Sequence, residues 1–263
     1  MLLQLSARNF GCFAEEVLFS MVASADATHP RHVVQSEAGR QPRILRLAAL
    51  YGANGHGKSQ LVEALRFMRD LVVEGTSAGD AIQRKPFRLD PTRLGEPSRF
   101  EIVIDHEGLE YSYGFSVDDE RVQEEWLFAR KTSKERRLFE RVTDTVGTVT
   151  VEFGPMLRGS TKQERQFLEF VAKGTRPNQL FLTEALDRNV EALTPLLRWF
   201  RRVLVRKGLP ARPVWRSAAN PDTERQWRAS ALRDSDGFDF AQTAAAGSRC
   251  RPGAGFAARD HRR

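Results

Sequence analysis

Residues 52–59 have the sequence Gly52-Ala53-Asn54-Gly55-His56-Gly57-Lys58-Ser59, which satisfies the pattern G-x-x-x-x-G-K-[S/T]. Glycine lets the backbone curl so that successive N–H groups point toward one anion, and a following helix presents its positive N-terminal end. The motif therefore predicts a phosphate-binding loop, or P-loop, that holds a nucleoside triphosphate. The alternative is an incidental glycine-rich turn that caps a helix, which the flanking segments disfavour.

The segments on either side of the motif have the patterns that a P-loop requires. Residues 44–51 form a short, almost wholly apolar run, which is typical of a strand buried on both faces of a sheet. After the motif, apolar residues recur every three or four positions, which predicts an amphipathic helix over residues 58–73. Strand, loop and helix are thus expected in the order of a P-loop unit.

Each residue type in the motif has a chemical role. The three glycines supply backbone freedom, Lys58 can reach the β and γ phosphates, and the Ser59 hydroxyl can complete the coordination shell of a magnesium ion. We expect ATP as the nucleotide and Mg²⁺ as the metal ion. The predicted ATP-binding residues are Gly52, Ala53, Asn54, Gly55, His56, Gly57, Lys58, Ser59 and Gln60, with Ser59 as the Mg²⁺ ligand.

The remaining patterns indicate strands first and helices afterwards. We expect two N-terminal strands around a turn at residues 9–14, then a polar loop over 23–43 and an irregular excursion over 74–97. Alternating and β-branched runs predict an antiparallel meander, with helices after Thr161 and over 190–204. The predicted fold is therefore α/β, with an antiparallel β-subdomain at about 99–153 and a helical segment at about 160–206. The strands are expected at 2–7, 15–21, 100–105, 110–117, 121–130, 138–142 and 148–153.

The composition is that of an ordinary globular protein, with 263 residues of which 41% are hydrophobic. No stretch approaches the ~18 consecutive apolar residues of a membrane span, and residues 1–13 lack the pattern of a signal or transit peptide. Cys12 and Cys250 lie near opposite ends of the chain, so neither a disulfide framework nor a Cys-x-x-Cys metal pair is predicted. We expect a cytoplasmic protein without membrane contact.

The formal charge of +7 is concentrated near the C-terminus. Residues 201–263 hold thirteen Arg, one Lys and six acidic residues, so this region carries +8 and residues 1–200 carry −1. Residues 211–263 are expected to form a basic, disordered tail, because most of 241–263 is Ala, Gly, Pro or Arg without a period. Such a tail can bind nucleic-acid phosphates, but a solvated charge run is the simpler interpretation. The same two alternatives apply to the last predicted helix, which carries Arg198, Arg201, Arg202, Arg206 and Lys207.

Hydrolysis of a nucleotide also requires an acidic residue at the end of another buried strand. Asp105 ends an apolar run, but we expect a solvated strand end there, and Asp118-Asp119 is expected to form a hairpin turn. Asp105 also begins a D-x-x-G sequence like that of GTPases, but no N-K-x-D follows, so a GTPase is disfavoured. We assign no catalytic carboxylate. His29 and His32 have no companions at ligand spacing and are expected to be surface residues.

Several short stretches, taken in order along the chain, resemble the N-terminal half of AAA-family ATP-binding proteins of the abortive-infection and OLD-like kind. These proteins have ATPase heads of the ABC, SMC and RecF type. The likeness covers about residues 1–206. Its marks are Arg8-Asn9-Phe10, the run from Leu47 through Ser59, Leu61-Val62-Glu63-Ala64-Leu65, Glu96-Pro97-Ser98-x-Phe100-Glu101-Ile102, Tyr111-Ser112-Tyr113-Gly114-Phe115, Glu124-Glu125-Trp126-Leu127 and Asn178-Gln179-Leu180-Phe181-Leu182.

The resemblance implies a head that dimerises around two ATP molecules and acts in phage defence, frequently beside a nuclease partner. The family's signature segment, its apolar run ending in Asp-Glu (Walker B) and its switch His are not found, so residues 1–210 are expected to be the N-terminal part of such a head. ATP hydrolysis is then expected only if those elements are supplied. Spacing leaves the Mg²⁺-sensing glutamine open among Gln83, Gln123, Gln163 and Gln179.

Two other functions compete with an ATPase part. One is a non-catalytic remnant or interaction module that binds a protein partner or nucleic acid through the basic tail or an exposed half-core. The other is a P-loop kinase of small molecules, which is disfavoured because no arginine-rich lid follows the motif.

Overall fold

The computed structural model describes residues 1–26, 28–35, 43–131, 134–159 and 161–203. The chain divides into two units, Met1–Arg206 and Lys207–Arg263, and every described residue belongs to the first. The predicted tail at 211–263, together with Arg206, Lys207 and Cys250, lies outside the described residues.

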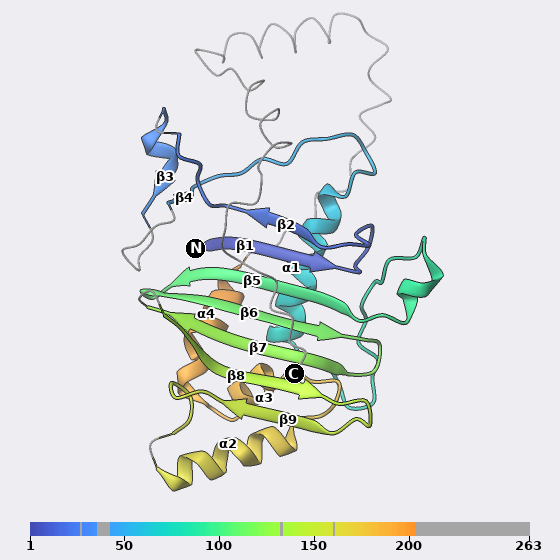
Figure 1. Ribbon diagram of the computed structural model, residues 1–263, viewed down its shortest axis with the longest axis vertical. Coiled ribbons are helices and arrows are strands. Elements are labelled where there is room, and N and C mark those ends of the chain that lie inside the picture. Colours follow the sequence, from blue (N-terminus) through green and yellow to red (C-terminus); the bar gives the residue numbers. More distant parts are fainter. Residues whose placement is uncertain (27, 36–42, 132–133, 160, 204–263) are drawn as a thin grey trace, which may run out of the picture. The chain divides into compact units, whose positions relative to one another are not determined.

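The described part is built on a seven-stranded antiparallel sheet with the strand order β2-β1-β5-β6-β7-β8-β9 (Figure 1). The predicted meander is confirmed, and the N-terminal hairpin joins it because β1 pairs with β5. A two-residue turn at Glu107-Gly108 connects β5 to β6, and both residues have positive φ angles, as tight hairpins require. The strands are β1 (Leu2–Arg8), β2 (Val17–Ser20), β5 (Ser98–His106), β6 (Leu109–Val117), β7 (Val122–Arg130), β8 (Glu135–Thr143) and β9 (Val149–Phe153).

Within the described residues, four α-helices accompany the sheet: α1 (Lys58–Val73), α2 (Lys162–Gly174), α3 (Phe181–Asp187) and α4 (Thr194–Arg202). The predicted bounds of α1 are confirmed. The helix α2 begins at a capping box, in which Thr161 and Glu164 satisfy each other's backbone N–H groups. The short α3 was not predicted, because its apolar run has no helical period. Three 3₁₀ helices complete the set: η1 (Pro30–His32), η2 (Pro91–Leu94) and η3 (Glu191–Leu193).

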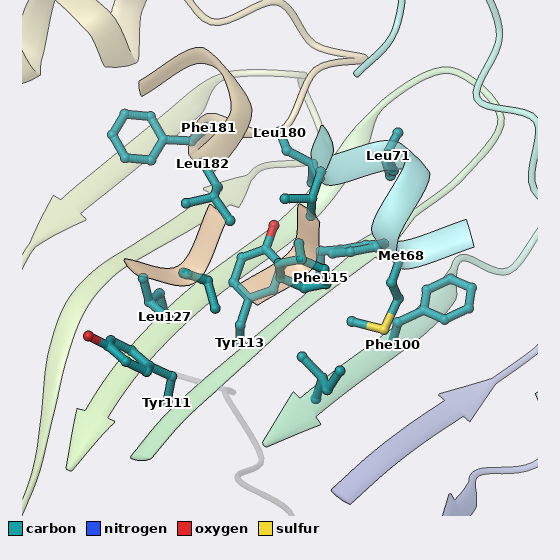
Figure 2. Packing of buried hydrophobic residues seen from close by; sticks show 14 of the residues in the cluster. Met68, Leu71, Phe100, Tyr111, Tyr113, Phe115, Leu127, Leu180, Phe181 and Leu182 are labelled. Atoms are coloured by element: carbon teal, nitrogen blue, oxygen red, sulfur yellow. The ribbon is translucent and has the colours of Figure 1, made fainter. Parts of the chain in front are cut away.

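One face of the sheet is covered by α1, α3 and α4, and the hydrophobic core fills the space between the layers (Figure 1). Figure 2 shows Met68 and Leu71 of α1 above Phe100 and Phe115 of the sheet. On α4, the Phe200 ring lies 5.9 Å from the Tyr113 ring, edge to face. The alternation of apolar residues along the strands produces this core face.

The apolar run before the motif does not form the predicted strand. Only Ile44–Leu45 (β4) is a strand, and it pairs antiparallel with β3 (Val33–Val34) inside the predicted polar loop. Leu47, Leu50 and Tyr51 are 81%, 45% and 75% exposed. A strand buried on both faces needs neighbouring strands on each side and a layer above and below it. No other strand of the described part pairs with residues 46–51, so the prediction of a buried strand over 44–51 is wrong for these residues.

Candidate nucleotide site

The loop at residues 52–59 has positive φ angles at its three glycines. Gly52, Gly55 and Gly57 have φ angles of 149°, 86° and 82°, a region that residues with a Cβ rarely adopt. Gly57 is the N-cap of α1, and its carbonyl accepts hydrogen bonds from the N–H groups of Gln60 and Leu61. The first N–H groups of α1 have no acceptor within the helix, so they are available to an anion at the loop.

Lys58 is folded back across the loop. Its Nζ donates hydrogen bonds to the carbonyl oxygens of Gly52 and Ala53, over 2.7 and 2.8 Å. Residues 50–56 and Ser59 are exposed, whereas Gly57 and Lys58 are half-buried. The ammonium group therefore sits at the centre of an open loop, where phosphate oxygens can replace the two carbonyl acceptors.

The turn between β1 and β2 packs against the loop and was not predicted as part of the site. A Cβ atom at Gly57 would lie 2.9 Å from both the Cys12 Sγ and the Phe13 ring. At Gly11 a Cβ would lie 2.2 Å from the Oε1 of Gln60, so the Gln60 amide faces the turn. The sequence signal was the glycine in the 9–14 turn, which permits this close approach.

Asn9 fixes that turn in place. It is fully buried and has a φ of 50°, and its Nδ2 donates to the carbonyls of Arg93 and Glu96, both over 2.8 Å. Its Oδ1 accepts a hydrogen bond from the Phe87 N–H. The Arg8-Asn9-Phe10 stretch thus ties the N-terminal hairpin to the excursion at 74–97.

Asp105 lies far from the loop. The Asp105 residue is 1% exposed, so the prediction of a solvated strand end is wrong. Its backbone N–H donates a hydrogen bond to the carbonyl of Met1, the residue just before β1. The turn that packs on the loop follows Arg8, whose partner on β5 is Arg99. Six residues of strand separate Arg99 from Asp105, which is about 20 Å. Asp105 therefore cannot act on a nucleotide in the loop.

The Asp118-Asp119 pair forms the predicted hairpin turn. The Asp118 Oδ1 accepts hydrogen bonds from the N–H groups of Glu120 and Arg121. Asp119 pairs with the buried guanidinium of Arg84, with 2.7 Å between Oδ1 and Nε. Both carboxylates are engaged in the turn rather than at the loop.

The four candidate glutamines are dispersed. Gln179 is 3% exposed and lies at the far end of α1, about 24 Å from the loop for a helix of 16 residues. Gln123 donates to Asp118, and Gln163 is exposed in the first turn of α2. Gln83 lies on a cleft of about 470 Å³ between one face of α1 and the segment that follows it. Gln179 is therefore too far from the loop to contact a bound nucleotide, and a Mg²⁺-sensing role for Gln83, Gln123 or Gln163 stays a prediction.

The remaining candidates lie on the surface. Arg201 and Arg202 are exposed on α4, and Arg198 pairs with Glu107 over 3.2 Å. The rings of His29 and His32 stack with centroids 5.2 Å apart, and both residues are exposed. No described helix is long and apolar enough to cross a membrane.

An open glycine-rich loop at the N-terminus of a helix, with a lysine at its centre, has the geometry expected of the P-loop class of nucleotide-binding protein. The chain belongs to the AAA family described as "AAA domain, putative AbiEii toxin, Type IV TA system", whose family model matches residues 47–232. A search of curated proteins found no match. The match confirms the resemblance to AAA-family ATPases of the abortive-infection kind. It begins in the apolar run before the loop and continues past the described residues.

Proposed function

We propose that residues 52–60 bind ATP together with Mg²⁺, and that the chain is the nucleotide-binding part of an ABC/SMC-like ATPase of phage defence. The observation that carries the proposal is the loop itself: three glycines at positive φ angles and the Lys58 ammonium held over the loop by two carbonyls. In the bound state Lys58 exchanges these carbonyls for β and γ phosphate oxygens. Charge-assisted hydrogen bonds of this kind are stronger than those to neutral carbonyls.

The other motif residues act through their backbone or a single oxygen. The N–H groups around Gly55 and Gly57, with those of Lys58 and Ser59, would surround the β phosphate, where the helix end favours negative charge. The exposed Ser59 hydroxyl supplies an oxygen ligand to Mg²⁺. Gln60 contributes by holding the loop in place, because its N–H donates to the Gly57 carbonyl and its side chain faces Gly11.

Binding without sustained hydrolysis is the activity that the described residues support. Asp105 lies about 20 Å along β5 from the end that faces the loop, and Asp118 and Asp119 are engaged by the N–H groups of their own turn and by Arg84. We therefore expect the carboxylate that orients the attacking water to come from elsewhere. We propose that residues 1–210 form the N-terminal part of an ATPase head and 211–263 a basic tail. A companion chain would supply the remaining catalytic groups, because a second copy has the same sequence as the first. A homodimer or a nuclease partner is the assembly that the family resemblance implies.

Cys12 provides a test that is specific for this loop. Its thiol is exposed and lies against Gly57, so a bound nucleotide is expected to shield it. In a Cys250→Ser background, ATP with Mg²⁺ should slow alkylation of Cys12 by iodoacetamide several-fold. The protection should vanish in Lys58→Ala and persist in Lys173→Ala, which removes a lysine from the end of α2. Equal alkylation rates with and without ATP would contradict binding at this loop.

A second function, an interaction module, is favoured by the apolar residues that precede the loop. Leu47 and Tyr51 are more than two-thirds exposed, although they belong to the apolar run at residues 44–51. If the module is the whole function, phosphate release stays at background and ATP affects neither association nor Cys12. Robust phosphate release by the isolated chain would instead show that it carries its own carboxylate.

A further inference from the structure

Residues 176–182, which connect α2 to α3 and include the first two residues of α3, form hydrogen bonds to the far end of α1, the helix that begins at the loop. Gln179 Oε1 accepts hydrogen bonds from both the N–H and the hydroxyl of Thr76, each over 2.9 Å. Asn178 Nδ2 donates to the carbonyls of Ser77 and Asp80, over 2.8 and 2.9 Å. The Thr76 hydroxyl also lies 2.8 Å from the Asn178 carbonyl. The chain directly after α1 is therefore held almost wholly by this segment.

The contact is close as well as polar. Gly75 has a φ of 69°, and a Cβ atom there would lie 2.8 Å from the Gln179 amide. Thr183 Oγ1, just beyond the segment, donates to the Val72 carbonyl in the last turn of α1 over 3.1 Å. The last turn of α1 and the start of α3 thus form one packed unit.

The other side of the segment is bonded to a buried ion pair on β7 and β8. The Glu125 carboxylate accepts hydrogen bonds from the N–H groups of Phe181 and Leu182, over 2.6 and 3.0 Å. Arg141 Nη1 donates to the Gln179 carbonyl over 2.6 Å and lies 3.9 Å from Glu125. The Tyr113 hydroxyl also donates to Glu125, over 3.1 Å. Both charged side chains are fully buried, and burial raises the pKa of Glu125 although Arg141 and these three donors oppose the shift.

A buried ion pair tolerates little movement of its partners. Taking both charges out of water is costly, and the cost is offset only while the surrounding hydrogen bonds keep their geometry. The bonds to Phe181, Leu182 and Gln179 therefore define the position of the segment sharply. Helix α1 is a rod of 16 residues whose loop end is open and whose other end is fixed by this arrangement.

We propose that residues 176–182 couple the nucleotide loop to the interior of the sheet, with Gln179 and Thr76 as positioning residues that set the placement of α1. The inference rests on the proposed ATP binding. A nucleotide that favours one placement of α1 must change the stability of the bonds at its far end, and a change at those bonds must change nucleotide affinity by the same factor. Gln179 accordingly acts through α1 rather than on the magnesium ion.

Substitutions at Thr76 and Gln179 test the coupling from one side. Gln179→Met and Thr76→Val keep the side-chain volume but remove the acceptor or the hydroxyl, and each should weaken ATP binding by about 3- to 10-fold. Thr76→Ser keeps the hydroxyl and should bind ATP within twofold of the native chain. All affinities are measured by calorimetric titration, after circular dichroism confirms that each variant is folded.

Hydrogen exchange in the native chain tests the coupling in the opposite direction, from the loop to the segment at residues 176–182. Saturating ATP with Mg²⁺ should slow exchange of the Phe181 and Leu182 amides, which are bonded to Glu125, and the effect should be lost in Lys58→Ala. If the native chain binds ATP but those amides exchange at the same rate and Gln179→Met binds as tightly, the coupling is wrong and ATP binding stands. If the native chain binds no ATP, both proposals are wrong.

Discussion

At the scale of single residues, Gly57 joins the loop to α1 at a point where no side chain fits. Its φ of 82° disfavours a Cβ, and the position that a Cβ would take lies 2.9 Å from the Cys12 sulfur and the Phe13 ring. Two independent reasons therefore favour glycine at this position: the positive φ angle, and the close packing of the turn at residues 9–14. The same residue sets the direction of the first N–H groups of α1 toward the loop.

Replacing Gly57 by Ala should therefore destabilise the fold. We expect a loss of about 1–3 kcal/mol in the free energy of unfolding, from backbone strain and from displacement of the turn. The measurement is urea denaturation, with Gly95→Ala as the matched control. Gly95 has a φ of −84° and no atom within 4 Å of a Cβ, so its substitution should change the free energy by less than about 0.5 kcal/mol. If both substitutions change the free energy of unfolding equally, the close contact between the turn at residues 9–14 and Gly57 does not contribute to stability.

At the scale of elements, the sequence predicted what depends on local pattern. The bounds of α1 follow from the recurrence of Leu61, Met68 and Leu71, and the meander follows from alternation in β5 to β9. The run at 46–51 was wrongly predicted as a strand, because its apolar pattern does not show whether neighbouring strands exist. The burial of Asp105 and the formation of α3 depend on distant contacts with Met1 and Glu125, which no local pattern reveals.

Glu125 links β7 to the start of α3, and its titration should be visible in the stability of the protein. Burial raises the pKa of Glu125 above its ordinary value of 4.5, so the folded state holds this proton more tightly than the unfolded state. The contribution of Glu125 to stability is then largest below pH 4.5 and falls as pH rises through the folded pKa.

Urea denaturation between pH 4.5 and pH 8 checks this sign. The free energy of unfolding of the native chain, relative to Glu125→Gln, should decrease as pH rises. The matched control is Glu120→Gln, since Glu120 is 80% exposed and should show no such trend. If the stability of the native chain relative to Glu125→Gln instead increases with pH, then the hydrogen bonds and Arg141 lower the pKa of Glu125 by more than burial raises it.

At the scale of the whole molecule, the described part combines a seven-stranded antiparallel sheet with an exposed apolar segment just before the loop. Leu47, Leu50 and Tyr51 together expose apolar surface within five residues of each other. Monomeric proteins seldom leave such a cluster uncovered. We therefore expect the chain to self-associate through residues 46–51.

Light scattering over a range of protein concentrations measures this association. The double variant Leu47→Lys, Tyr51→Lys should shift the chain toward the monomer and leave its thermal midpoint nearly unchanged, because both side chains contribute little to the core. Val146→Lys is the control, since Val146 is 87% exposed between β8 and β9, at the sheet edge opposite to β1 and β2. If the double variant associates as strongly as the native chain, the exposed run is not the contact surface.

The central claim is that residues 52–60 bind ATP with Mg²⁺, and calorimetric titration of the purified chain tests it most directly. The native chain should bind with a measurable heat, and Lys58→Ala should weaken binding by about 30-fold or more, as loss of a charge-assisted contact of ~2–3 kcal/mol implies. Lys173→Ala should bind as the native chain does. Binding that is unchanged in Lys58→Ala, or no binding by the native chain, would contradict the account.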